Sequence, residues 1–332
     1  MTEDLRIGLG LWSGQHGDPT DAVALARAGE DAGFDAFWVT EHHGLPDGYL
    51  PSPLTVLAAC ATATSRIELA TGVVLAPLHH PLRLAEDAAL VDRLSGGRLL
   101  LGLGLGYAEH EYRAFGVDPS RRGERLEALV GALRAAGTGE PFSAPALGLH
   151  DVRVTPTPAR PIPLWLGGYA DRAVARAGRL ADGHLVGRGE PAIVEAASRT
   201  LAGVRDPADP TFVRGVVVTC VLDAPGGGAA QARAGFARAQ QAYEDIQRGR
   251  AVYAGLAEPV AASDTDAHLQ VRGDVDEVVA GLRAVVAGLA AWSRAHLVIR
   301  LLFAEPDLDT ALTRVATVGE RVLPRLRSPE AS

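Results

Sequence analysis

The chain has 332 residues, of which 47% are hydrophobic and 22% are charged, and its formal net charge is −8 at pH 7. This length suits one large α/β barrel or two ordinary domains, and the acidic balance argues against nucleic-acid binding. All 32 basic residues are arginine, which excludes lysine Schiff-base chemistry and the P-loop. No apolar run is long enough to span a membrane. The two cysteines lie in separate apolar runs, so we expect a protein of a reducing compartment, the cytoplasm.

Strand patterns and helix patterns alternate eight times along the chain. The expected strands cover residues 6–12, 34–43, 66–77, 97–106, 161–168, 184–187, 211–222 and 296–303. The expected helices cover residues 18–32, 51–64, 82–94, 121–136, 171–180, 190–203, 275–289 and 308–323. Near-continuous apolar strands are typical of a parallel sheet that is buried on both faces. The pattern therefore predicts a single-domain TIM (β/α)8 barrel over residues 1–332.

Two segments are too long to be simple connections between these elements. Residues 139–160, after the fourth strand, are rich in proline and predict an excursion with a short hairpin. Residues 225–272, after the seventh strand, combine a glycine run with a helical pattern. We interpret the second insertion as a helical lid over the barrel mouth.

The second strand ends abruptly in the polar cluster Thr40-Glu41-His42-His43. An α/β barrel places its chemistry at the C-terminal ends of its strands. A lone histidine is often only hydrogen-bonded to backbone or solvated, but a titratable cluster at a strand end favours a functional site. Glu41, His42 and His43 are therefore the candidate catalytic residues.

Glycines mark two further strands. Gly102, Gly104 and Gly106 stand at every second position of the fourth strand, a spacing that fails the dinucleotide fingerprint. This row either clears one strand face for a flat ring system or packs against small side chains, and the two interpretations are about equally supported. Thr71-Gly72-Val73 interrupts the third strand and predicts a bulge or an unusual backbone.

A candidate anion site follows the fifth strand. Residues 166–171 read as a strand end, a glycine pair and a helix start, where exposed N–H groups suit a phosphate. An ordinary βα turn is an equally good interpretation. Arg121, Arg122 and Arg125 open the helix after the fourth strand, and one of them could clamp a phosphate. His79 and His80 could line the same mouth, whereas the spacing of potential ligands argues against a metal site.

Several short motifs, in this order and spacing, resemble the bacterial luciferase-like monooxygenases. They are Glu41-His42-His43, residues 70–77, residues 80–87, residues 94–98, the glycine row 102–106 and residues 112–116. The resemblance is dense over residues 5–125 and recurs at 165–168 and 181–183. It is weak over the expected lid and returns faintly at 296–303 and 319–323.

The resemblance implies a TIM barrel that binds FMN, commonly as reduced flavin from a separate reductase, and that forms a homodimer. It further implies that O2 adds to the flavin and that the resulting hydroperoxide oxygenates a small organic substrate. His42 falls on the family's general base, with His43 beside it, and Gly72–Val73 falls on its non-prolyl cis peptide. The cofactor-binding residues implied in this way are Thr71, Gly72, Val73, Gly104, Gly106, Tyr107, Arg125, Gly167, Gly168, Tyr169 and Ala170, with no metal ligand.

The chain also departs from luciferase. Gly104 and Leu105 stand where luciferase carries a reactive cysteine and a phosphate-binding arginine, so light emission is not expected. The first hypothesis is a flavin-dependent monooxygenase whose dry pocket is lined by Trp12, Trp38, Val73 and Leu103. One alternative is an oxidoreductase that transfers hydride with a deazaflavin coenzyme and does not activate oxygen. The second is a non-catalytic flavin-binding or dimer-partner subunit, although such subunits tend to lose the active-site histidine.

Overall fold

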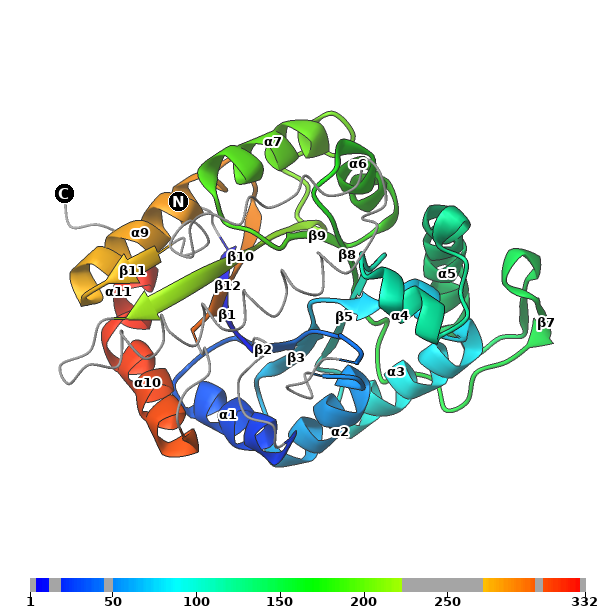
Figure 1. Ribbon diagram of the computed structural model, residues 1–332, viewed down its shortest axis with the longest axis horizontal. Helices are drawn as coiled ribbons and strands as arrows, with labels where there is room; N and C mark the ends of the chain where they lie inside the picture. The colour runs from blue at the N-terminus through cyan, green and yellow to red at the C-terminus, as the bar shows by residue number, and fades with distance from the viewer. Residues whose placement is uncertain (1–3, 12–18, 45–49, 223–270, 302–306, 329–332) are drawn as a thin grey trace.

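The computed structural model describes residues 4–11, 19–44, 50–222, 271–301 and 307–328, in which eight parallel strands close into a barrel (Figure 1). The barrel strands are β1 (Asp4–Gly10), β2 (Ala36–Val39), β3 (Glu68–Thr71), β5 (Leu99–Gly104), β8 (Leu164–Gly167), β9 (Gly183–Val186), β10 (Val213–Leu222) and β12 (Arg294–Arg300). Each strand pairs with the next in this order, and β12 pairs with β1 to close the ring. The predicted TIM barrel is confirmed.

Helices surround the ring of strands (Figure 1). They are α1 (Pro19–Asp31), α2 (Pro53–Ala63), α3 (Pro81–Ser95), α5 (Arg122–Ala136), α6 (Asp171–Leu180), α7 (Pro191–Ala202), α9 (Val275–Ala287) and α10 (Leu308–Arg321), followed by α11 (Leu323–Arg327). Proline in the first turn starts several of them, because that position needs no N–H donor. Asp274 and Glu277 form a capping box that starts α9. No helix in the described ranges is long and apolar enough to cross a membrane.

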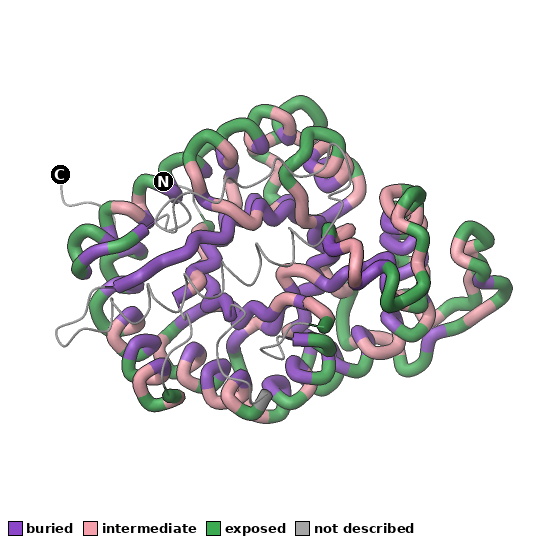
Figure 2. Tube along the Cα trace, in the orientation of Figure 1, coloured by how far each residue is buried: buried purple, intermediate pink, exposed green. Residues whose placement is uncertain are grey.

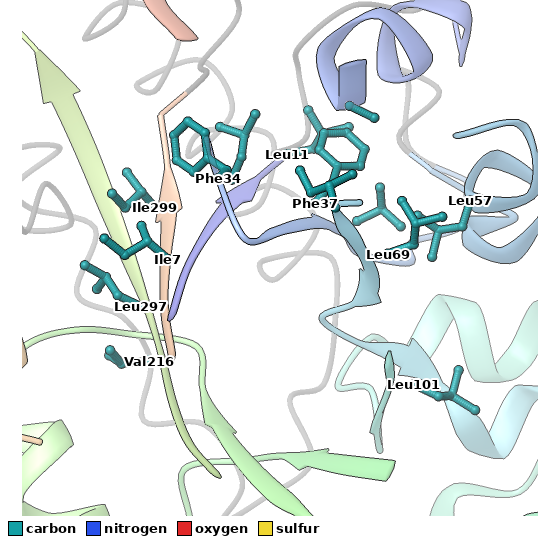
Figure 3. Close-up of a cluster of buried hydrophobic side chains, with 14 of the residues drawn as sticks. Ile7, Leu11, Phe34, Phe37, Leu57, Leu69, Leu101, Val216, Leu297 and Ile299 are labelled. Atoms are coloured by element: carbon teal, nitrogen blue, oxygen red, sulfur yellow. The ribbon is translucent and has the colours of Figure 1, made fainter. Parts of the chain in front are cut away.

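The hydrophobic core has two layers separated by the barrel wall. The outer layer lies between strands and helices, and includes Ile7, Leu297 and Val216 from three neighbouring strands (Figure 3). The inner layer fills the barrel with Ala36, Trp38, Ala70, Leu100, Trp165, Leu185, Val217 and Val298. The strands are accordingly buried along most of their length, whereas the helices expose one face (Figure 2).

The alternation of side chains along β5 corrects one prediction. Leu100 belongs to the inner layer, whereas Leu103 belongs to the outer layer against the helices. Leu103 therefore does not line the barrel interior, because neighbouring residues of a strand face opposite sides. Trp12, also predicted to line the pocket, lies outside the described residues.

The expected third strand, 66–77, is two short strands in the structure. β3 ends at Thr71, β4 (Val74–Leu75) resumes the pairing with β5, and the intervening Gly72–Val73 bond is cis. The expected cis peptide is therefore present. A short 3-10 turn, η1 (Ala76–Leu78), leads on to α3.

The two expected insertions have different outcomes. Residues 139–160 contain β6 (Phe142–Ala144), the turn η3 (Pro145–Leu147) and β7 (Leu149–Val152), an antiparallel hairpin that projects away from the barrel (Figure 1). Most of the expected lid, 225–272, lies outside the described residues. The structure resumes at β11 (Val271–Gly273), which pairs with the end of β10.

The connection after β5 contains two short elements that the sequence analysis did not predict. They are the helix α4 (Glu109–Ala114) and the 3-10 turn η2 (Pro119–Arg121). The helix α4 lies next to the C-terminal end of the barrel strands and supplies a buried carboxylate to the candidate site.

Candidate active site

Glu41 occupies the centre of a hydrogen-bonded cluster at the C-terminal end of β2. Its side chain is 1% exposed and accepts hydrogen bonds from His43 Nε2 at 3.0 Å, His79 Nε2 at 2.8 Å and the Leu75 amide at 2.5 Å. Burial alone would raise the pKa of Glu41, but the hydrogen bonds from His43, His79 and Leu75 outweigh it and lower the pKa to about 2. Glu41 is therefore an anchor that stays ionised and orients two histidines.

His42 has a different carboxylate partner. Its Nδ1 lies 3.1 Å from Oε1 of Glu111, a residue of α4 that is 1% exposed. The same oxygen accepts a hydrogen bond from the His43 amide at 2.9 Å. An ionised carboxylate can only accept, so Nδ1 of His42 is the donor in this contact and proton transfer falls to Nε2. This arrangement suits a general base that is oriented by a second group.

Aromatic rings flank the two histidines. Tyr107 stands edge-on to the His42 ring with centroids 5.8 Å apart, and Phe115 lies 4.5 Å from the His43 ring centroid. His110 Nε2 lies 2.8 Å from the His43 carbonyl oxygen, to which it donates. Tyr107, one of the predicted cofactor-binding residues, thus contacts His42.

The predicted glycine row on β5 makes room for the cis segment. Thr71 Oγ1 donates to the Gly102 carbonyl at 2.8 Å and accepts from the Gly102 amide at 2.9 Å. An added Cβ on Gly102 would overlap the Thr71 carbonyl oxygen, and one on Gly104 would overlap the Val73 side chain. At these two positions the structure supports packing rather than an open face. Gly106 has a φ of 72°, which favours glycine.

Two tryptophans and a histidine fill the barrel interior. Trp38 and Trp165 lie with ring centroids 5.5 Å apart, and both meet His296 edge-on. Trp38 Nε1 donates to His296 Nε2 at 3.2 Å, and burial lowers the pKa of His296 to about 3. The interior is therefore apolar, and the buried imidazole of His296 is neutral at physiological pH.

The predicted anion site is a turn at the C-terminal end of β8, at the same barrel end as the histidines. Gly167 ends the strand, and Ala170 is the N-cap residue of α6 but contributes no side-chain cap. Backbone N–H groups and the helix dipole favour an anion at such a position. The Gly168 amide donates to the Leu185 carbonyl at 3.3 Å, and the Tyr169 side chain is half exposed.

The three predicted arginines separate in the structure. Arg121 pairs with Glu124 on the surface, and Arg122 donates to the Pro119 carbonyl at 3.3 Å. Arg125 is half-buried and donates to the His79 carbonyl at 3.4 Å. Arg125 therefore contacts the histidine cluster through the His79 backbone. No group of side chains suited to a metal ion occurs in the described ranges.

Glu111 is the main site residue that sequence reasoning missed. It belongs to Glu109-His110-Glu111, an acidic segment that starts a short helix five residues after the end of β5. Acidic residues so soon after the C-terminal end of a barrel strand could have indicated a site residue in this segment. His79, expected only to line the mouth, is a direct partner of Glu41.

Curated relatives of this chain include proteins that are named as monooxygenases. It is 35% identical over 156 residues to 4-hydroxyprotoasukamycin monooxygenase of Streptomyces nodosus subsp. asukaensis, covering 46% of this chain and 40% of that protein. It is 33% identical over 122 residues to the oxygenase component of flavin-dependent trigonelline monooxygenase of Acinetobacter baylyi, covering 36% and 34%. The matched parts amount to less than half of either relative.

Solved structures share the fold along nearly the whole chain. The oxygenating constituent of 3,6-diketocamphane monooxygenase of Pseudomonas putida, in complex with FMN, is 17% identical with a TM-score of 0.74, covering 99% of this chain and 100% of that one. An F420-dependent secondary alcohol dehydrogenase is 18% identical with a TM-score of 0.76, covering 98% and 100%. At these identities the likeness shows a common fold. The family described as luciferase-like monooxygenase matches residues 5–291. The chain therefore belongs to the luciferase-like monooxygenase family.

Proposed function

We propose that this chain is the oxygenase of a flavin-dependent monooxygenase, which uses reduced FMN and O2 to oxygenate a small organic substrate. The observation that carries the proposal is the pair of histidines at the barrel mouth, each held by its own buried carboxylate. Glu111 holds His42 and Glu41 holds His43. Such pairing fixes the orientation of each imidazole, as general-base catalysis requires.

The residues of the barrel mouth fit a phosphorylated flavin. The N-terminus of α6 has no side-chain cap, so its first N–H groups suit a phosphate, and Arg125 adds positive charge at the same end of the barrel. When bound, reduced FMN supplies the electrons that activate oxygen. The glycine pair Gly167–Gly168 packs closely beside Val73 and Ala173, whose side chains an added Cβ would meet at 3.0 Å and 2.6 Å.

The chain's own residues would perform two tasks. His42 would take a proton from the reacting group at Nε2 while Glu111 stabilises the imidazolium that forms. Trp38, Trp165 and Val73 would keep water away from the reacting atoms, because they form an apolar interior below the mouth. We also propose that a separate reductase supplies the reduced flavin and that the chain forms a homodimer. The relative that is named as an oxygenase component supports the first of these.

Hydride transfer with a deazaflavin coenzyme is the second candidate function. The observation in its favour is that an F420-dependent dehydrogenase has the same fold. The two paired histidines favour the monooxygenase, because each is held in the manner of an acid–base group. The same pairs argue against a non-catalytic partner subunit.

The deciding experiment is an anaerobic titration with reduced FMN followed by rapid mixing with oxygen, with absorbance as the readout. We expect saturable binding and a transient absorbing species that outlives the oxidation of free reduced FMN. A parallel titration with reduced deazaflavin coenzyme should show weaker binding. Tight deazaflavin binding, with reduced FMN oxidising as it does free in solution, would replace the proposal by hydride transfer.

A further inference from the structure

A buried arginine–histidine pair lies behind the turn that precedes α6. Arg214 of β10 and His184 of β9 are both 0% exposed. Arg214 Nη1 donates to His184 Nδ1 at 3.0 Å, and His184 Nε2 donates to the Gly168 carbonyl at 2.9 Å. The barrel wall is thus joined to the turn by two consecutive side-chain hydrogen bonds.

Chemistry sets the direction of both hydrogen bonds. A guanidinium has donors only, so the Nδ1 of His184 must accept, and the ring proton lies on Nε2, which faces Gly168. Only the neutral Nε2–H form of His184 satisfies both partners. Burial and the nearby charge of Arg214 both lower the pKa of His184 well below its ordinary value, so this form persists at neutral pH.

Arg214 is costly to bury. Its guanidinium also donates to the carbonyl oxygens of Gly215 at 2.8 Å and Val194 at 3.4 Å, while Nε has no hydrogen-bond partner within the described ranges. None of the described carboxylates forms an ion pair with it. A buried charge that none of the described carboxylates neutralises costs stability, which points to a role beyond holding the fold together.

The contacts at Gly168 determine the orientation of the next peptide. Its amide donates to Leu185 and its carbonyl accepts from His184, so both hydrogen bonds connect the turn to β9. In a planar trans peptide, the Gly168 C=O and the Tyr169 N–H point in opposite directions. The bond to His184 therefore aims the Tyr169 amide away from β9. An added Cβ on Gly168 would lie 2.6 Å from the Ala173 Cβ, so the turn is also packed closely against α6.

We propose that Arg214 and His184 are positioning residues that hold the Gly168–Tyr169 peptide in the orientation that receives the phosphate group of the cofactor. The inference rests on the proposed function, in which this turn binds the phosphate of FMN. Neither residue touches the phosphate itself. Their loss should therefore weaken the contribution of the phosphate to binding and leave the contribution of the ring system unchanged.

The test compares dissociation constants for reduced FMN and reduced riboflavin, which has the same ring system but no phosphate. Wild type is compared with His184→Leu, which removes both hydrogen bonds, and with His184→Gln, whose amide offers N–H donors and a carbonyl acceptor. We expect His184→Leu to weaken FMN binding by about tenfold or more while riboflavin binding stays the same. His184→Gln should restore most of the preference for FMN.

The outcomes separate a failure of the phosphate site from a failure of the positioning role alone. If wild type binds both flavins equally, the phosphate site of the proposed function fails, and this inference fails with it. If wild type prefers FMN and His184→Leu keeps that preference, only the positioning role fails. The same holds if His184→Leu weakens the binding of both flavins equally.

A second measurement applies even if the leucine variant does not fold. In wild type with 15N-labelled histidine, the Nε2–H signal of His184, assigned by its loss in His184→Gln, should shift with FMN and stay in place with riboflavin. An unchanged signal at saturating FMN would overturn the positioning role.

Discussion

Oε1 of Glu111 and Nδ1 of His42 lie 3.1 Å apart although the two residues are 69 positions apart in the chain. The contact exists because α4 follows β5 and returns to the C-terminal end of β2. It converts a histidine at a strand end into an oriented pair, with the second carboxylate oxygen of Glu111 left without a hydrogen-bond partner within the described ranges. The first two predictions follow from this pair.

Replacing His42 by alanine should lower kcat by about 100-fold to 10,000-fold, because general-base catalysis contributes a factor of that size. The dissociation constant for reduced FMN should change little, since His42 is assigned to proton transfer rather than to cofactor binding. His80→Ala is the matched control, because His80 is an exposed histidine at the start of α3. Steady-state kinetics and flavin titration check both variants, and an unchanged kcat in His42→Ala would exclude His42 as the base.

Replacing Glu111 by glutamine should lower kcat by about 100-fold or more at a similar KM. The amide can donate to His42 Nδ1, which favours the tautomer with the proton on Nε2 and removes the basic nitrogen from its place. Glu109→Gln on the same helix is the control, because Glu109 pairs with Arg113 at the surface. Equal kinetics in both variants would show that Glu111 does not orient His42.

Glu41 should contribute to stability in a pH-dependent way. Its pKa is about 2 in the folded protein and about 4.5 in the unfolded chain, so its contribution is present above pH 4.5 and is lost as pH falls toward 2. The size is about 3 kcal/mol at neutral pH, from the pKa difference. Denaturant unfolding of wild type and Glu41→Gln should therefore differ at pH 7 and converge near pH 2. Glu86→Gln is the control, because Glu86 is a partly exposed carboxylate of α3 that pairs with Arg83. A difference that is independent of pH would contradict the assigned pKa.

Two glycine-to-alanine substitutions should change the free energy of unfolding in opposite directions. Gly102→Ala should destabilise the protein by about 2 kcal/mol or more, because the new Cβ overlaps the Thr71 backbone oxygen, which cannot move away easily. Gly131→Ala should stabilise it by about 0.5–1 kcal/mol, because Gly131 lies inside α5 with no atom within 4 Å of the added Cβ. Thermal or denaturant unfolding measures both, and destabilisation of similar size in the two variants would show that the close approach of β3 to β5 is not what requires Gly102.

The barrel and the position of its histidines could be read from the sequence by itself. Strand and helix periodicities are local, and eight alternating repeats suffice to indicate a closed parallel barrel. Glu41, His42 and His43 directly follow an apolar strand, and the C-terminal strand ends of a barrel share one face. That Gly72–Val73 interrupts the third strand was visible as a glycine within an apolar run.

Only the tertiary structure decided which groups act together. The pairing of Glu111 with His42, the filling of the space beside Gly102 by Thr71, and the outward direction of Leu103 all depend on how neighbouring strands are aligned. The contact of Arg214 with His184 depends on the register of β9 and β10. These contacts join residues that are far apart in the sequence, and a shift of one residue in strand register would exchange inward and outward side chains. Local patterns contain no information about that register, so the partners of the histidines emerge only when the barrel closes.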